Sequence, residues 1–208
     1  MSKTRLEAFT DAVIAIVMTI LVLELKTPEH ATLEALWELR FQFFTYLVSF
    51  LTLAIYWNNH HHLFQASRQV SGKVLWLNIL LILCMSLFPL TTAWMGENVF
   101  ERAPELAYAA VMLTADVVWL CLARALAHVN GVQSTIAVSL KASGYRKSAI
   151  SISLVALGMA VGVFLPMAAL VACLASLVPW VVPDRDIERR LHGPKDPGQG
   201  DTQHHEQP

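Results

Sequence analysis

The feature that most constrains this chain is the length of its segments without charge. Residues 148–183 contain no Asp, Glu, Lys or Arg, and residues 41–57 and 74–96 are shorter segments of the same kind. A helix needs about 20 apolar residues to cross the roughly 30 Å hydrocarbon core of a bilayer. Charged residues make up 15% of the chain, against about 25% in a typical soluble domain. The sequence therefore predicts an all-α protein that spans a membrane.

Six transmembrane helices are predicted. We expect them at residues 8–26, 38–60, 74–95, 105–127, 146–165 and 167–183. An even number of spans places both termini on one side of the membrane. If the N and C termini are cytoplasmic, 12 of the 15 Lys and Arg residues lie on the cytoplasmic side, as the positive-inside rule requires.

The last 25 residues differ from the rest of the chain. Residues 184–208 have few apolar side chains and several Gly and Pro residues, a composition that does not support a packed core. We expect residues 1–183 to form the membrane domain and residues 184–208 to be a disordered cytoplasmic tail.

Composition and motifs exclude several functions. The formal net charge of -1 gives no basic excess for binding nucleic acid. The chain has no Gly-x-Ser-x-Gly, no His-Glu-x-x-His and no phosphate-binding glycine loop, so we expect neither an enzyme nor a cofactor. It also lacks the Thr-Val-Gly-Tyr-Gly filter of carbonyl-lined potassium channels. The adjacent histidines at residues 60–62 cannot share one helical face, and we predict no metal site there.

The first predicted helix has the most unusual pattern. Only 12 residues separate Asp11 from Glu24, which is too few to span a bilayer. If this helix crosses the membrane, Asp11 or Glu24 must therefore lie within it, where acidic side chains are costly and usually functional. A helical wheel places Ile16, Ile20 and Leu23 on one stripe, with Thr19 at its edge and Asp11 about 140° from Ile16. Taken alone, an apolar stripe is more typical of core packing.

Candidate partners for the Asp11 carboxylate lie on the next two helices. One of the histidines at residues 60–62, or Asn78 at the start of the third helix, would be on the same side of the membrane as Asp11. Asp116, midway along the fourth helix, is either a proton-relay or ion site, or a buried acid hydrogen-bonded to a neighbour.

Three motifs in the first 95 residues carry a resemblance to a known family. Arg5-x-x-x-Phe9-Thr10-Asp11 resembles the first-helix signature Arg-x-x-x-Phe-Ser-Asp of the transmembrane protein 175 family, the lysosomal potassium channels and their prokaryotic relatives. Trp57-x-x-His60-His61 and Leu77-Asn78 match later positions of the same family. The second half of the chain resembles the family only in its hydropathy.

The resemblance implies a potassium-preferring cation channel whose pore is lined by the first helix. The family's constriction residue corresponds to Ile16, and the next pore-facing positions correspond to Ile20 and Leu23, with Thr19 beside them. Because the signature occurs once here and twice in animal members, the resemblance implies a homotetramer in a prokaryotic cell membrane, with the bilayer and the permeant potassium ion as its other partners.

The resemblance also implies a polar network that holds the first helix against the second and third. Its members would be Arg5, Thr10, Asp11, His60 or His61, and Asn78. Thr10 stands where the family usually has serine and keeps the hydroxyl group.

Two other functions remain open at this point. A proton-coupled secondary transporter would use Asp11, Asp116 and a histidine as its relay, although no inverted repeat or paired interrupted helices are visible. A non-conducting membrane scaffold would use the tail to bind a partner.

Overall fold

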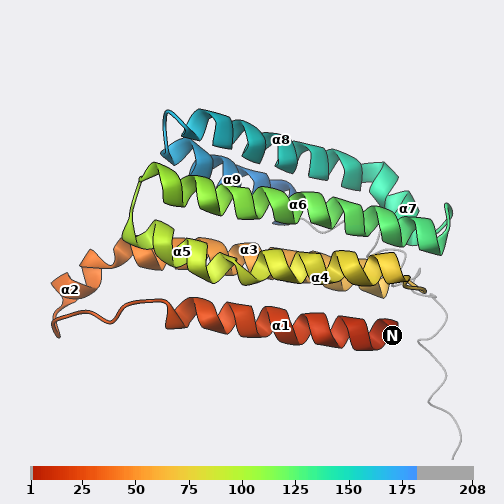
Figure 1. Cartoon of the computed structure of the whole chain (residues 1–208), viewed down its shortest axis with the longest axis horizontal. Helices are drawn as coiled ribbons and strands as arrows, with labels where there is room; N and C mark the ends of the chain where they lie inside the picture. The colour runs from red at the N-terminus through yellow and green to blue at the C-terminus, as the bar shows by residue number, and fades with distance from the viewer. Residues whose placement is uncertain (1, 182–208) are drawn as a thin grey trace, which may run out of the picture.

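The protein folds as a bundle of antiparallel helices arranged in layers (Figure 1). The computed structural model describes residues 2–181, and all regular structure within that range is helical. The predicted tail, residues 184–208, lies outside the described residues, as do residues 182–183 of the predicted membrane domain. The elements are α1 (Lys3–Leu23), α2 (Leu33–Glu38), α3 (Arg40–Gln65), α4 (Gly72–Ser86), α5 (Phe88–Glu97), α6 (Arg102–Asn130), α7 (Thr135–Ser139), a π-helix η1 (Leu140–Gly144), α8 (Tyr145–Gly162) and α9 (Met167–Val181).

The layers differ in how many neighbouring helices pack on them. α1 lies on one side of the bundle and packs on α3, α4 and α5. α6 follows as the next layer, in contact with α4 and α5, and α8 and α9 form a hairpin that packs on α6 (Figure 1). α1 is therefore covered by the rest of the chain on one side only.

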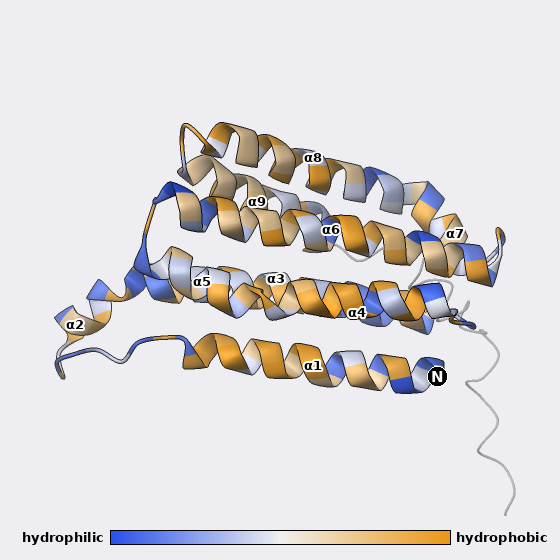
Figure 2. Ribbon diagram, in the orientation of Figure 1, coloured by the Kyte–Doolittle hydropathy of each residue, from blue (hydrophilic) through white to orange (hydrophobic). Residues whose placement is uncertain are grey.

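Within the described residues 2–181, three helical segments are long and apolar enough to cross a membrane. They are α1, the nearly continuous pair α4–α5 (Gly72–Glu97) and α6, and α9 is a shorter apolar helix. Hydrophilic residues gather at the helix ends and in the connections, whereas the middle portions are hydrophobic (Figure 2). This distribution agrees with the prediction of an all-α membrane protein, while the count of six spans stays a prediction.

Local chemistry moves several helix boundaries from their predicted positions. α1 begins at Lys3, not at residue 8, because the Ser2 side chain caps it by accepting a hydrogen bond from the Arg5 backbone N–H. α3 continues through the three histidines to Gln65, beyond the predicted residue 60. The short α2 was not predicted from the sequence.

The third predicted helix is interrupted. α4 ends at Ser86 and α5 begins at Phe88, where Pro89 occupies the first turn. Proline has no N–H to donate and its ring clashes with the carbonyl four residues earlier. The interruption therefore follows from Pro89, and the two short helices still run as one segment.

The α8–α9 hairpin depends on close contact at glycine. A Cβ added to Gly158 would lie 2.1 Å from the Cβ of Ala172 and 3.1 Å from the carbonyl oxygen of Ala168. Gly162, one turn later, faces Ala169 and Leu106. The Gly-x-x-x-Gly step is thus used for packing inside the chain, as small residues are in many membrane helix pairs.

We predict that Gly158→Ala destabilises the hairpin, because its methyl group has no room beside α9. Overpacking of this kind costs about 1–3 kcal/mol, which should lower the thermal unfolding midpoint of the purified protein in detergent. Gly72→Ala is the matched control, since no atom lies within 4 Å of its added Cβ. Equal midpoints for the two variants would contradict this account of the α8–α9 contact.

Candidate functional site

α1 has one buried face and one exposed face. Its buried residues are Leu6, Thr10, Ile14, Val17 and Leu21. On the opposite side Ile16 is 57% exposed and Leu23 is 77% exposed. Thr19 is also exposed, and its hydroxyl donates to the Ile16 carbonyl oxygen at 2.7 Å, whereas Ile20 is half-buried. The four residues of the predicted stripe thus lie on the uncovered side of α1, with Ile20 at its border.

Three buried side chains attach the other face of α1 to the bundle. The Asn78 amide nitrogen donates to the Thr10 hydroxyl at 2.7 Å, and the Asn78 amide oxygen lies 2.8 Å from His60 Nε2. None of these residues is exposed to solvent. The chain of bonds joins α1, α4 and α3, so Thr10, His60 and Asn78 come together as one buried cluster.

The hydrogen-bond pattern also fixes the roles within this cluster. Because the Asn78 nitrogen donates to Thr10, its oxygen is the acceptor, and His60 Nε2 must carry the proton. The Thr10 hydroxyl in turn donates to the Leu6 carbonyl oxygen at 2.9 Å. His60 Nδ1 is buried without a hydrogen-bond partner among the described residues. A neutral imidazole, acting as a fixed donor, is sufficient for this arrangement.

Asp11 and His61 lie outside that buried cluster and make different contacts. The Trp57 indole N–H donates to the Asp11 carboxylate at 3.0 Å. One turn earlier on α1, the Glu7 carboxylate lies 3.4 Å from His61 Nδ1, and the Gln65 amide lies 2.8 Å from His61 Nε2. These contacts form a second, more exposed connection between α1 and α3.

Arg5, the remaining predicted network residue, is not brought into either cluster. Arg5 is exposed, and its backbone N–H donates a hydrogen bond to the Ser2 side chain. Lys3 instead makes the basic contact at this end of α1, since its ammonium donates to the Ser67 carbonyl oxygen at 2.8 Å.

The sequence contained a signal for the second connection that sequence analysis did not use. Glu7 and Asp11 are four residues apart on α1, and Trp57 and His61 are four residues apart on α3. Residues at this spacing lie on one helical face, so two polar pairs can meet across the contact between the two helices.

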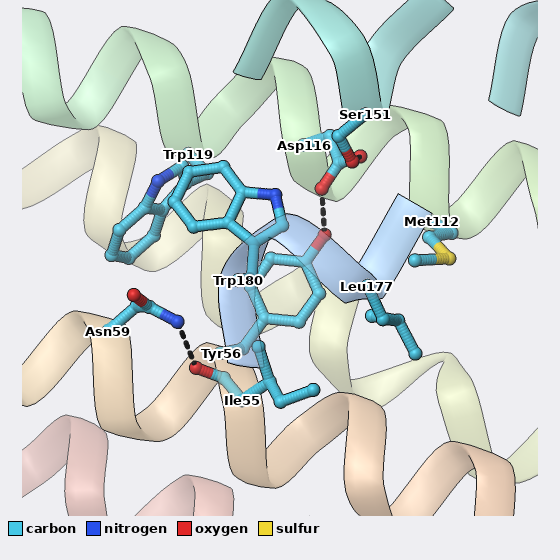
Figure 3. Close-up of a pocket in the computed structure, with 9 residues that line it drawn as sticks. All are labelled: Ile55, Tyr56, Asn59, Met112, Asp116, Trp119, Ser151, Leu177 and Trp180. Atoms are coloured by element: carbon cyan, nitrogen blue, oxygen red, sulfur yellow. Dashed lines mark hydrogen bonds between the residues drawn. The ribbon is translucent and has the colours of Figure 1, made fainter. Parts of the chain in front are cut away.

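Asp116 forms a separate cluster on the far side of α3 (Figure 3). Its two carboxylate oxygens accept hydrogen bonds from the Tyr56 and Ser151 hydroxyls, each at 2.5 Å. The cluster joins α3, α6 and α8 beside a cavity of about 20 Å³ whose lining includes Trp119 and Trp180. A cavity of this volume has room for about one water molecule.

The two acids of the transporter hypothesis therefore belong to different clusters. Asp11 contacts Trp57, and Asp116 contacts Tyr56. Neighbouring residues of a helix point about 100° apart, so the two carboxylates meet different faces of α3. Within residues 2–181, no group of three or more His, Cys, Asp or Glu side chains is arranged to hold a metal ion.

Known proteins resemble this chain in sequence and in fold. The family model described as endosomal/lysosomal potassium channel TMEM175 matches residues 5–89, which include most of α1 and the residues of both its connections to α3. A potassium channel from Chryseobacterium sp. (strain P1-3) is 37% identical over 191 residues, which cover 92% of this chain and 98% of that protein.

Other relatives match a smaller part of this chain or resemble it in fold at lower sequence identity. The endosomal/lysosomal proton channel TMEM175 of Mus musculus is 34% identical over 116 residues, which cover 50% of this chain and 23% of that protein. The crystal structure of a lysosomal potassium-selective channel TMEM175 homolog from Chamaesiphon minutus superposes with a TM-score of 0.76 at 22% identity, covering 88% of this chain and 97% of that one. On the nearly full-length match to the Chryseobacterium protein, this chain belongs to the TMEM175 family.

Proposed function

We propose that this protein is a potassium-preferring cation channel that conducts passively through a pore lined by α1. The observation that carries the proposal is the uncovered aliphatic stripe of α1, whose opposite face is fixed to the bundle by buried hydrogen bonds. A relative that matches nearly the whole chain is named a potassium channel, and family membership agrees with the prediction that the chain is not an enzyme.

A pore of this kind requires several copies of the chain. One α1 helix cannot surround an ion, and the chain carries one copy of the Arg-x-x-x-Phe-Thr-Asp signature. We propose a homotetramer in which four α1 helices surround a central axis. Four Ile16 side chains would then form the constriction, with Ile20 and Leu23 farther along the pore and Thr19 beside them.

Selectivity in such a pore follows from the cost of dehydration. An aliphatic ring offers no oxygen ligands to replace the water that an ion loses on entry. Potassium holds its water less tightly than sodium, so it passes at lower cost and the preference is moderate. Further narrowing of the ring would expel water and close the pore. Exposed Glu24, which follows α1 directly, would attract cations to one entrance.

The proposed membrane topology has six spans with both termini in the cytoplasm. The spans would be α1, α3, the α4–α5 pair, α6, α8 and α9, within a membrane domain of residues 1–183. The placement of 12 of 15 basic residues on the cytoplasmic side supports this orientation. The protein would reside in a prokaryotic cell membrane, with residues 184–208 as a cytoplasmic tail.

We expect Ile16→Asn to increase cation flux and to reduce the preference for potassium over sodium, because an amide wets the constriction. The measurement is potassium and sodium flux into liposomes that contain the purified protein. Leu83→Asn is the matched control, since Leu83 is 56% exposed on α4, close to the 57% of Ile16.

The flux ratios of the two variants distinguish a pore-lining position from a position on a lipid-facing surface. Leu83→Asn should leave the ratio of potassium to sodium flux unchanged. If Ile16→Asn also leaves it unchanged, Ile16 does not form the constriction. Flux that saturates or requires a proton gradient would instead favour the coupled transporter.

We expect Thr10→Val to loosen α1, because it leaves the buried Asn78 amide nitrogen without its acceptor. An unsatisfied buried donor costs on the order of 1–3 kcal/mol, so the thermal unfolding midpoint should fall. Thr10→Ser keeps the hydroxyl and should stay close to the parent protein. A Thr10→Val midpoint equal to that of Thr10→Ser would argue against this bond as an anchor of α1.

We expect native mass spectrometry of the protein released from detergent micelles to give four chain masses. In that assembly the four stripes would face one another around the pore axis, so Leu23→Glu would bring four carboxylates together and should convert the tetramer to smaller species through charge repulsion. Leu83→Glu, at an exposed position of α4 outside the stripe, should leave four copies together. A parent protein that runs as a monomer would contradict the tetramer.

A further inference from the structure

The end of the bundle that holds the N terminus is basic. Between Glu38 and Glu97, and between Asp116 and the end of α9, the described chain contains no Asp or Glu. The basic residues of these two segments that lie near this end include Arg68, Lys73, Arg124, Lys141 and Arg146. The acids of the described chain at this end, Glu7 and Asp11, are on α1 and contact His61 and Trp57.

A cavity of about 430 Å³ opens in this basic end. It lies between the connection from α3 to α4 and the connection from α6 to α7. Its lining residues include Arg68, Asn130, Gln133, Ser134 and Thr135. These residue types carry one guanidinium, two amides and two hydroxyls, which are all able to donate hydrogen bonds.

The two walls of the cavity are tied together by Asn130. Its amide oxygen accepts from the backbone N–H groups of Arg68 and Gln69 at 2.7 and 3.0 Å. Its amide nitrogen donates to the Ser67 hydroxyl and to the Gln69 carbonyl oxygen at 3.1 and 3.0 Å. Because one side chain holds the α3–α4 connection against the end of α6, the cavity is formed before any ligand arrives.

Exposed apolar residues place this cavity near the surface of the proposed membrane. Trp76, one turn beyond Lys73 on α4, is 71% exposed, and Val132 in the cavity wall is 74% exposed. Indole side chains prefer the headgroup level of a bilayer. In the proposed membrane, a ligand in this cavity would lie between the hydrocarbon and the donors of the cavity wall.

We propose that this cavity binds the phosphate headgroup of an anionic phospholipid, with Arg68 as the charged ligand. The donors and the neighbouring apolar side chains together fit a lipid better than a free anion, since only a lipid would also contact the apolar residues. Basic cavities between membrane helices on the cytoplasmic side are suited to such headgroups. The proposal rests on the membrane insertion in the proposed function and not on conduction.

The test is lipid binding to the full-length protein, measured by native mass spectrometry in detergent. Dioleoylphosphatidylglycerol is compared with dioleoylphosphatidylcholine, which has the same acyl chains and no net charge. We expect tighter binding of phosphatidylglycerol and a loss of about fivefold in its affinity for Arg68→Gln, the effect of one basic residue at a membrane surface.

Two further variants distinguish lipid binding in the cavity from nonspecific attraction by the positive charge at this end of the bundle. Lys141→Gln removes a charge at the same end but outside the cavity lining, and should change the affinity by less than about twofold. Gln133→Trp fills the cavity without changing the charge, and should weaken phosphatidylglycerol binding as Arg68→Gln does. It also keeps the test decisive if Arg68→Gln does not fold.

Three results would overturn the proposal. The first is equal binding of the two lipids, and the second is an equal loss for Lys141→Gln and Arg68→Gln. The third is binding of soluble glycerol phosphate as tight as that of the lipid, which would assign the cavity to a free anion. Because the readout is binding, failure of ion flux in liposomes would leave this test unaffected.

Discussion

The hydrogen bonds of Asn78 are the interaction on which the arrangement of α1 depends. A helix that is covered on one side only could rotate about its axis with little loss of apolar contact. The Asn78 amide meets Thr10 on one side and His60 on the other, all without solvent exposure. Since a buried donor or acceptor without a partner is costly, only one rotation of α1 satisfies all three groups. That rotation leaves Ile16 and Leu23 uncovered.

α3 serves as the common partner for the buried polar groups. Ser49 accepts from Thr92 at 2.6 Å and donates to Tyr108 at 3.2 Å, which joins α5 and α6. Two turns later Tyr56 binds Asp116, and one turn beyond it His60 binds Asn78. Hydrogen bonds between helices of a membrane bundle require a specific direction, whereas apolar contacts do not. The position of α3 relative to the neighbouring helices is therefore specified at three levels along its length.

Sequence analysis identified the helical membrane class and most of the long helices, because uncharged length is a property of the sequence itself. It placed the α8–α9 break near Pro166, where α8 ends at Gly162 and α9 begins at Met167. It missed the start of α1, which depends on a single hydrogen bond to the Ser2 side chain, and the interruption at Leu87, which follows from Pro89 in the first turn of α5. The residues proposed for the pore and the network came from the wheel and from resemblance to a family.

The sequence by itself determined that the chain is helical, where its apolar segments lie and that Ile16, Ile20 and Leu23 share one stripe of α1, since these properties depend on composition and a fixed helical period. Only the tertiary structure decided which histidine meets Asn78, that Asp11 pairs with Trp57, and that Asp116 belongs to another face of α3. Adjacent residues such as His60 and His61 have the same chemistry in the sequence. The difference arises because about 100° of helical rotation sends one of them into the bundle and the other toward Glu7.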